Sequence, residues 1–156
     1  MKRFSVLSLS AVLALAVASI SDSTFAQQRV TKDQLVGTWT LVSCTAFCVN
    51  HNGRMMLDAT GQYMITQAPR GRPKCSGTCG RAQMSGDQYK AIAQDFFSDF
   101  GNWSFNEADQ TLTMTLEAAL TPNAEGTQEK WKMSLTGDEL RRVDAAGHTV
   151  LWRRVR

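Results

Sequence analysis

The chain has 156 residues, of which 43% are hydrophobic, and its 17 Lys and Arg against 14 Asp and Glu give a net charge of +3. This length corresponds to one compact domain. The mild positive charge excludes the strongly basic surface that is typical of nucleic-acid-binding proteins, so we expect no nucleic-acid partner.

The first 26 residues have the three parts of a secretory signal peptide. Lys2 and Arg3 form the positive start, residues 4–20 are mainly apolar, and a polar stretch ends at Ala26, where small residues suit signal peptidase. A membrane anchor is the alternative, but serines interrupt the apolar stretch, which falls short of the roughly 20 apolar residues that a span needs. We therefore expect a signal peptide over residues 1–26 and one domain over residues 27–156, periplasmic or secreted after cleavage near Ala26, with no stable membrane anchor.

Alternating hydrophobic residues predict strands on both sides of a long loop and a helix. A helical turn with a capping box at Thr31 and Gln34 precedes three strands, over residues 37–43, 54–57 and 62–67. The glycine-rich segment 68–86 is expected to be a loop. Ser85 and Gln88 mark the start of a helix over residues 87–100, whose aromatic residues recur at helical spacing and are expected to face the core. Five further strands follow, over residues 102–106, 111–118, 126–135, 139–143 and 148–155.

The four cysteines, Cys44, Cys48, Cys75 and Cys79, all lie in the part predicted to be exported. Oxidising compartments favour disulfides, so we prefer two disulfides to the alternative, a zinc or copper site with His51 close by. Three pairings are possible. Pairing the first two cysteines with the later two would close loops of about 30 residues, each worth on the order of 3 kcal/mol. We expect this pairing, which would tie the first strand to the long loop before the helix.

Short turns make neighbouring strands antiparallel, and eight such strands can close into a small barrel that has no exposed edge. The predicted fold class is therefore all-β: an eight-stranded antiparallel up-and-down barrel with one helix inserted between strands 3 and 4. Alternation places Leu112, Met114 and Leu116 on the inward face of their strand.

Several blocks of the sequence together match a known pattern: Leu35–Ser43 with Gly37-x-Trp39, Gly61–Met64, Phe100–Trp103, Pro122–Thr127 and Leu151–Arg154. Through these blocks the chain resembles the bacterial lipocalin-like domain family of the calycin superfamily. The resemblance implies a lipocalin-like barrel in which Trp39 plugs the closed end beneath an arginine from a late strand, either Arg142 or Arg154. Met114 and Trp131 depart from it, because the family pattern usually has a histidine and an arginine there, and the four cysteines indicate an exported variant.

A small barrel with an apolar interior can hold one small ligand in its mouth, so the partner we expect is a small hydrophobic molecule. The oligomeric state and the identity of the ligand stay open. We expect the ligand cavity to be lined by Tyr63, Phe96, Phe105, Met114, Trp131 and Met133.

A small barrel enzyme that acts on a hydrophobic molecule is the competing class. His51 and His148 have no nucleophile or carboxylate partner at a diagnostic spacing, and no G-x-S-x-G motif is present in the sequence. Glu117, or Asp95 with Arg142, could do acid–base work, but both carboxylates are expected to face solvent. We assign no catalytic residue, cofactor or metal. A structural or interaction protein without an internal ligand is the third possibility.

Overall fold

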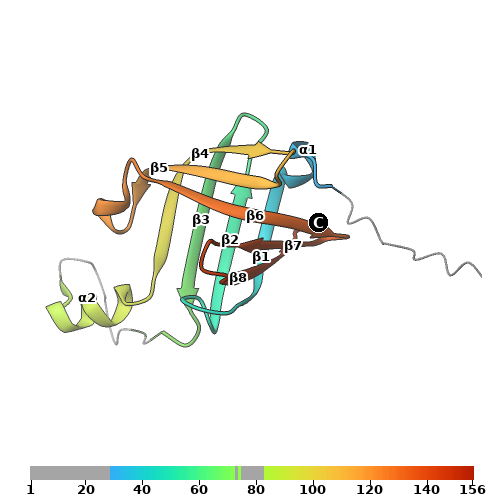
Figure 1. The fold of residues 1–156 in the computed structure, drawn as a ribbon. Coiled ribbons are helices and arrows are strands. Elements are labelled where there is room, and N and C mark those ends of the chain that lie inside the picture. The colour runs from blue at the N-terminus through green and yellow to red at the C-terminus, as the bar shows by residue number, and fades with distance from the viewer. Residues whose placement is uncertain (1–28, 73, 75–82) are drawn as a thin grey trace, which may run out of the picture.

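The computed structural model describes residues 29–72, 74 and 83–156, which form a closed barrel of eight antiparallel strands (Figure 1). Each strand pairs with the next along the chain, and β8 returns to pair with β1. The predicted fold class is thus confirmed, while the predicted signal peptide lies outside the described residues. The strands are β1 (Gly37–Cys44), β2 (His51–Leu57), β3 (Gln62–Pro69), β4 (Phe97–Asn106), β5 (Thr111–Ala119), β6 (Gln128–Thr136), β7 (Glu139–Val143) and β8 (Thr149–Arg154).

Short helical segments accompany the strands in the described ranges, among them α1 (Lys32–Leu35), α2 (Gly86–Ala93) and the 3-10 helix η2 (Pro122–Ala124). The helix starts agree with the predicted capping boxes. The backbone N–H of Gln88 donates to Ser85 Oγ at 3.3 Å, and that of Ser85 donates to the Gln88 side chain at 2.8 Å. None of the helices in the described ranges is long and apolar enough to cross a membrane.

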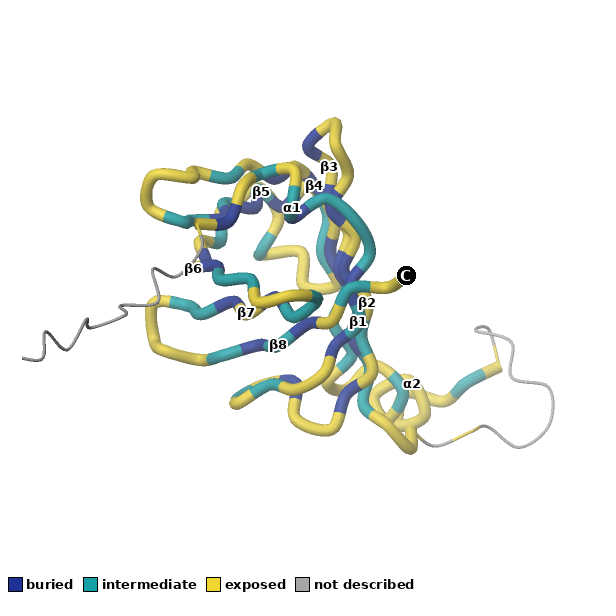
Figure 2. Tube along the Cα trace, turned by 90° about the vertical axis from the view of Figure 1, so that its right-hand side faces the viewer, coloured by how far each residue is buried: buried dark blue, intermediate teal, exposed yellow. Residues whose placement is uncertain are grey.

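The helix α2 is much shorter than the predicted helix over residues 87–100. It ends at Ala93, and β4 begins at Phe97. Residues 97–102 pair with β3. The phenylalanines at positions 97 and 100 therefore belong to a β-strand, where successive side chains point to opposite faces, and do not lie on one face of a helix. No residue of α2 is buried, and Figure 2 shows its trace exposed outside the barrel wall. The expectation that a helical aromatic stripe faces the core is therefore wrong.

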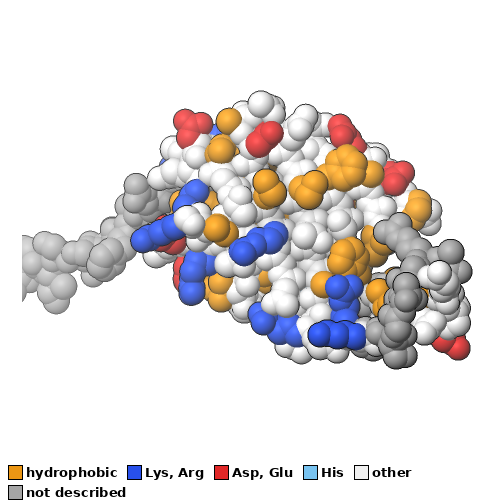
Figure 3. Space-filling model, turned by 180° about the vertical axis from the view of Figure 1, so that it is seen from behind, with side chains coloured by type: hydrophobic (Ala, Val, Ile, Leu, Met, Phe, Trp, Pro, Cys, Tyr) orange, Lys and Arg blue, Asp and Glu red, His pale blue; other side chains and the backbone are white. Residues whose placement is uncertain are grey.

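The core fills the barrel with side chains from alternate positions of the strands, as the change between buried and exposed colours along the tube shows (Figure 2). Leu112, Met114 and Leu116 are buried as predicted. At Gly101 a β-bulge brings β4 against β5, and a Cβ atom there would lie 2.1 Å from the carbonyl oxygen of Thr115. The outer surface carries hydrophobic side chains among polar ones (Figure 3), including exposed Met64.

One end of the barrel is closed by α1 and by the first residues of β1. Trp39 is fully buried, and its Nε1 donates to the carbonyl oxygen of Leu35 at 2.9 Å. The Arg154 guanidinium lies 4.2 Å from the centroid of the Trp39 ring and donates hydrogen bonds to the carbonyl oxygens of Val36 and Gln34. These contacts join the last strand to the first and seal this end.

The disulfide joins Cys44 to Cys48, so the expected link between the first two cysteines and the later pair is wrong. Cys44 ends β1, and the turn that follows brings Cys48 back to a Cα–Cα distance of 5.5 Å, which suits a disulfide. Such a short loop is worth about 2 kcal/mol in the chain-entropy model, less than a long one. Cys75 and Cys79 lie outside the described residues.

Candidate functional site

A cavity of about 450 Å³ opens at the end of the barrel opposite α1. At this end β6 extends beyond β7: β7 ends at Val143, which pairs with Lys132, so residues 128–131 of β6 have no partner on β7. Two other hollows, of about 390 and 430 Å³, lie on the outer wall and are lined mostly by polar side chains. The cavity is lined by Phe47, Asp95, Phe96, Phe97, Glu129, Trp131, Arg142 and Asp144.

Four aromatic residues make the cavity wall largely apolar. Phe47 comes from the loop after β1 and is 50% exposed, and Phe96 and Phe97 come from the start of β4. Trp131 comes from β6, is buried, and donates from Nε1 to Glu129 Oε2 at 3.0 Å. Because these rings come from three different parts of the chain, only closure of the barrel brings them together.

Arg142 of β7 lies at the inner end of this cavity and is 1% exposed. Its guanidinium carbon lies 3.8 Å from the centroid of the Trp131 ring and 5.8 Å from that of Trp152. Its Nε and Nη1 atoms are buried without a hydrogen-bond partner among the described residues. Buried charged donors normally have a hydrogen-bond acceptor, and these two nitrogen atoms of Arg142 depart from that rule.

Two further buried polar side chains, Tyr63 of β3 and Asp99 of β4, interact electrostatically with Arg142. Tyr63 Oη and Asp99 Oδ1 have no hydrogen-bond partner of good geometry in the described part of the chain. We call Tyr63, Asp99 and Arg142 the polar floor, of which Arg142 is the member that lines the cavity. Among the described residues, Gln67 and His51 are the other buried polar side chains, and most of the remaining buried side chains are apolar.

Burial shifts the titration of all three groups of the polar floor. It lowers the pKa of Arg142 to about 10, against the opposing effect of Glu129 and Asp99, so the guanidinium stays protonated at neutral pH. Burial raises the pKa of Asp99 to about 6, with the Tyr63 hydroxyl opposing this rise, and it also raises the pKa of Tyr63. Near neutral pH the floor therefore holds one permanent cation and one carboxyl that can gain or lose a proton.

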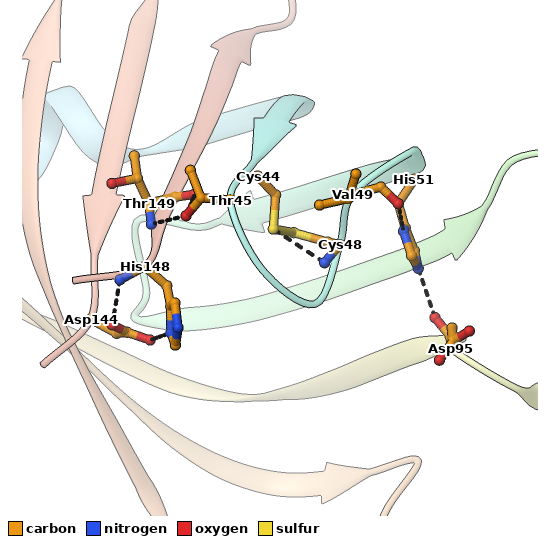
Figure 4. Close-up of a disulfide and its surroundings, with 9 residues drawn as sticks. All are labelled: Cys44, Thr45, Cys48, Val49, His51, Asp95, Asp144, His148 and Thr149. Atoms are coloured by element: carbon orange, nitrogen blue, oxygen red, sulfur yellow. Dashed lines mark hydrogen bonds and ion pairs between the residues drawn. A yellow bond between two sulfur atoms is a disulfide. The ribbon is translucent and has the colours of Figure 1, made fainter. Parts of the chain in front are cut away.

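Phe47, which lines the cavity, belongs to the loop that the Cys44–Cys48 disulfide closes. Figure 4 shows the contacts of this loop with its neighbours. Thr45 and Thr149 exchange hydrogen bonds of 3.0 and 2.9 Å, which connect this loop to β8. His51 Nδ1 lies 2.9 Å from the carbonyl oxygen of Val49, and its Nε2 lies 2.9 Å from that of Asp95 (Figure 4). Through these two contacts His51 connects the loop after β1 to Asp95, which lies just before β4.

Of the other residues considered for catalysis, Asp95 is exposed and lines the cavity, whereas His148 and Glu117 are not among the lining residues. His148 pairs with Asp144 at 2.8 Å on the surface, and Glu117 is exposed and accepts a hydrogen bond from Asn102. Cys44 and Cys48 are bonded to each other and offer no thiolate to a metal. In the described ranges, no group of three or more His, Cys, Asp or Glu residues could hold a metal ion.

The residues predicted to line the cavity occupy three places. Phe96 and Trp131 lie together at the cavity, and Tyr63 belongs to the polar floor. Met114 and Met133 are buried in the core, and Phe105 packs against the core near the end of β4. Of the two candidates for barrel closure, Arg154 covers Trp39, whereas Arg142 lies beside Trp131 in the other half of the barrel.

Sequence reasoning missed Asp99, because the helix predicted through residue 100 left its position without an inward or outward assignment. Had the strand been extended back from Trp103 by alternation, Asp99 would have fallen on the inward face. It also missed Phe47 and Glu129, which line the cavity from the loop after β1 and from β6. Phe97 was expected near one end of the cavity, but on a helix, whereas it begins β4.

Comparison with known proteins agrees with this architecture. A family model described as a lipocalin-like domain matches residues 36–153, which extend from the start of β1 almost to the end of β8. A search of curated proteins found no match. The chain therefore belongs to the lipocalin-like domain family.

Proposed function

We propose that this chain is an exported protein that binds a small, mainly apolar molecule in the cavity at the open end of its barrel. The observation that carries the proposal is the aromatic wall of the cavity, formed by Phe47, Phe96, Phe97 and Trp131. Its volume of about 450 Å³ is within the range of small-molecule sites. The closed end, sealed by Trp39, leaves the other end of the barrel as the route of entry.

A fluorescent hydrocarbon tests this proposal. Diphenylhexatriene emits only in apolar surroundings, and it should bind at one saturable site, with energy transfer from tryptophan. Phe47→Asp should weaken this binding about tenfold or more, because it places a charge on the apolar wall. Phe100→Asp is the matched control, since Phe100 is 46% exposed and Phe47 is 50% exposed, but Phe100 is not among the residues that line the cavity.

The control variant should bind the hydrocarbon as tightly as the native chain does. Absence of a saturable site in the native protein, or equal effects of the two substitutions, would overturn the proposal. Export is tested separately. The full chain would be produced with its N-terminal segment in a Gram-negative host, and the N-terminus of the periplasmic product should begin at Gln27. Retention of residues 1–26 in the recovered protein would contradict cleavage.

A further inference from the structure

Arg142 differs from the other arginines whose contacts the structure describes. Arg153 and Arg156 pair with carboxylates on the surface, and Arg154 donates to backbone carbonyl oxygens. Arg142 is buried, protonated at neutral pH and without a hydrogen-bond partner for Nε and Nη1. A buried charged donor without an acceptor costs free energy. Binding of a ligand that supplies an acceptor would recover this free energy, so it would be favourable at this position.

The three nearby carboxyl groups do not supply this acceptor. Asp99 interacts electrostatically with Arg142, but Asp99 Oδ1 and the Nε and Nη1 atoms of Arg142 all lack a hydrogen-bond partner in the described part of the chain. Glu129 and Asp144 act on Arg142 electrostatically, but Glu129 Oε2 accepts from Trp131. Both oxygens of Asp144 accept hydrogen bonds from His148 or from the backbone N–H groups of Ala146 and His148.

The charge balance around Arg142 determines which kind of acceptor fits. One cation faces three carboxyl groups, Asp99, Glu129 and Asp144. A ligand carboxylate would add a fourth negative group to a partly desolvated site and would be repelled. An uncharged carbonyl or hydroxyl oxygen accepts the same hydrogen bonds without adding charge.

The position of Trp131 limits how the acceptor can approach. Because the indole lies 3.8 Å from the guanidinium carbon, it covers one face of the guanidinium, and the N–H groups donate from the edge. The Tyr63 hydroxyl is a second buried donor without a partner of good geometry, and it interacts electrostatically with both Asp99 and Arg142. The apolar body of a ligand would then remain against the aromatic wall.

We propose that the barrel selects an apolar molecule that carries an uncharged oxygen group, such as a ketone or an alcohol, and that this oxygen accepts hydrogen bonds from Arg142 and Tyr63. This inference rests on the proposed function. It adds that the polar floor recognises one end of the ligand and so fixes its orientation in the cavity.

Three probes with the same aromatic body test the inference: 6-propionyl-2-(dimethylamino)naphthalene, its 6-propyl analogue and its 6-carboxylate analogue. The ketone should bind about tenfold to a hundredfold more tightly than the propyl compound, as expected for a hydrogen bond to a buried charged donor. The carboxylate should bind more weakly than the ketone. All three are measured by fluorescence titration of the full domain at pH 7.5.

Two variants connect this preference to the polar floor. Arg142→Met keeps an unbranched side chain similar to the aliphatic part of arginine but removes the donors, so it should abolish the preference for the ketone and retain binding of the propyl compound. Tyr63→Phe removes only a hydroxyl that has no hydrogen-bond partner of good geometry and whose effect within the chain is on Asp99, so the fold should be preserved. It should reduce the affinity for the ketone several-fold, in line with the loss of one neutral hydrogen bond. If Arg142→Met does not fold, the affinity of Tyr63→Phe for the ketone tests whether the polar floor binds the ligand oxygen.

Equal binding of ketone and propyl compound by the native protein would overturn this inference while leaving the proposed function intact. Tightest binding of the carboxylate would also overturn it, in favour of an acidic ligand. An unchanged affinity of Tyr63→Phe for the ketone would remove Tyr63 from the site. Failure of all three probes to bind would instead refute the proposed function on which the inference rests.

Discussion

Replacing Asp99 with asparagine should make the barrel more stable at neutral pH, because the native carboxylate ionises in a buried site. Asp99 is 3% exposed, and burial raises its pKa from the ordinary 3.8 to about 6. The folded state therefore holds the proton more tightly than the unfolded state does. It follows that the contribution of this group to stability is complete below about pH 4 and is lost as the pH rises to about 6.

The size of this effect follows from the difference between the two pKa values. It corresponds to about 3 kcal/mol at pH 7.5, and about half of this amount is already lost at pH 5. Asparagine resembles the protonated carboxyl in shape and charge, so Asp99→Asn should avoid the loss. The variant and the native chain should have similar free energies of unfolding near pH 4 and differ by up to about 3 kcal/mol at pH 7.5.

Urea denaturation followed by tryptophan fluorescence, at several pH values from 4 to 7.5, measures this difference directly. Comparing the two proteins at each pH cancels the titration of the other acidic residues. Glu117→Gln serves as the control, because this side chain is exposed and its amide oxygen can still accept the hydrogen bond from Asn102. A free-energy difference between Asp99→Asn and the native chain that does not change with pH would refute the description of Asp99 as a desolvated carboxyl.

Three further changes should alter stability, each measured by urea denaturation at pH 7.5. Arg154→Met should cost about 3 kcal/mol, because it removes two charged hydrogen bonds and the contact with the plug at the closed end; a loss below about 1 kcal/mol would contradict this role. Gly101→Ala should cost about 3 kcal/mol or more, because its Cβ would overlap the Thr115 carbonyl oxygen, whereas Gly86→Ala, with open space around it, should be nearly neutral. Cys44→Ser should cost only about 2 kcal/mol, and a loss as large as that of Arg154→Met would show that the disulfide does more than close a short loop.

The sequence was a sufficient guide to the fold because period-two alternation and turn residues are local signals. The strand over residues 139–143 has the predicted bounds, and the others differ at one or both ends. The largest shifts are at β2 and β4, where turn-forming residues 50–53 and the phenylalanines near residue 97 suit more than one local structure. At these places pairing with a neighbouring strand decided the outcome, and no local pattern contains that information.

Alternation determined which side chains point inward, but not how deep along the barrel each one lies. Leu112, Met114 and Leu116 could be assigned to the interior from the sequence, since that depends only on the parity of their positions. The different places of Arg142 and Arg154 depend on the register between strands, which only the closed barrel fixes. In the same way, only the turn after β1 decided that Cys44 pairs with Cys48. The barrel was therefore determined by local sequence patterns, whereas the cavity and its polar floor were decided by tertiary contacts between distant strands.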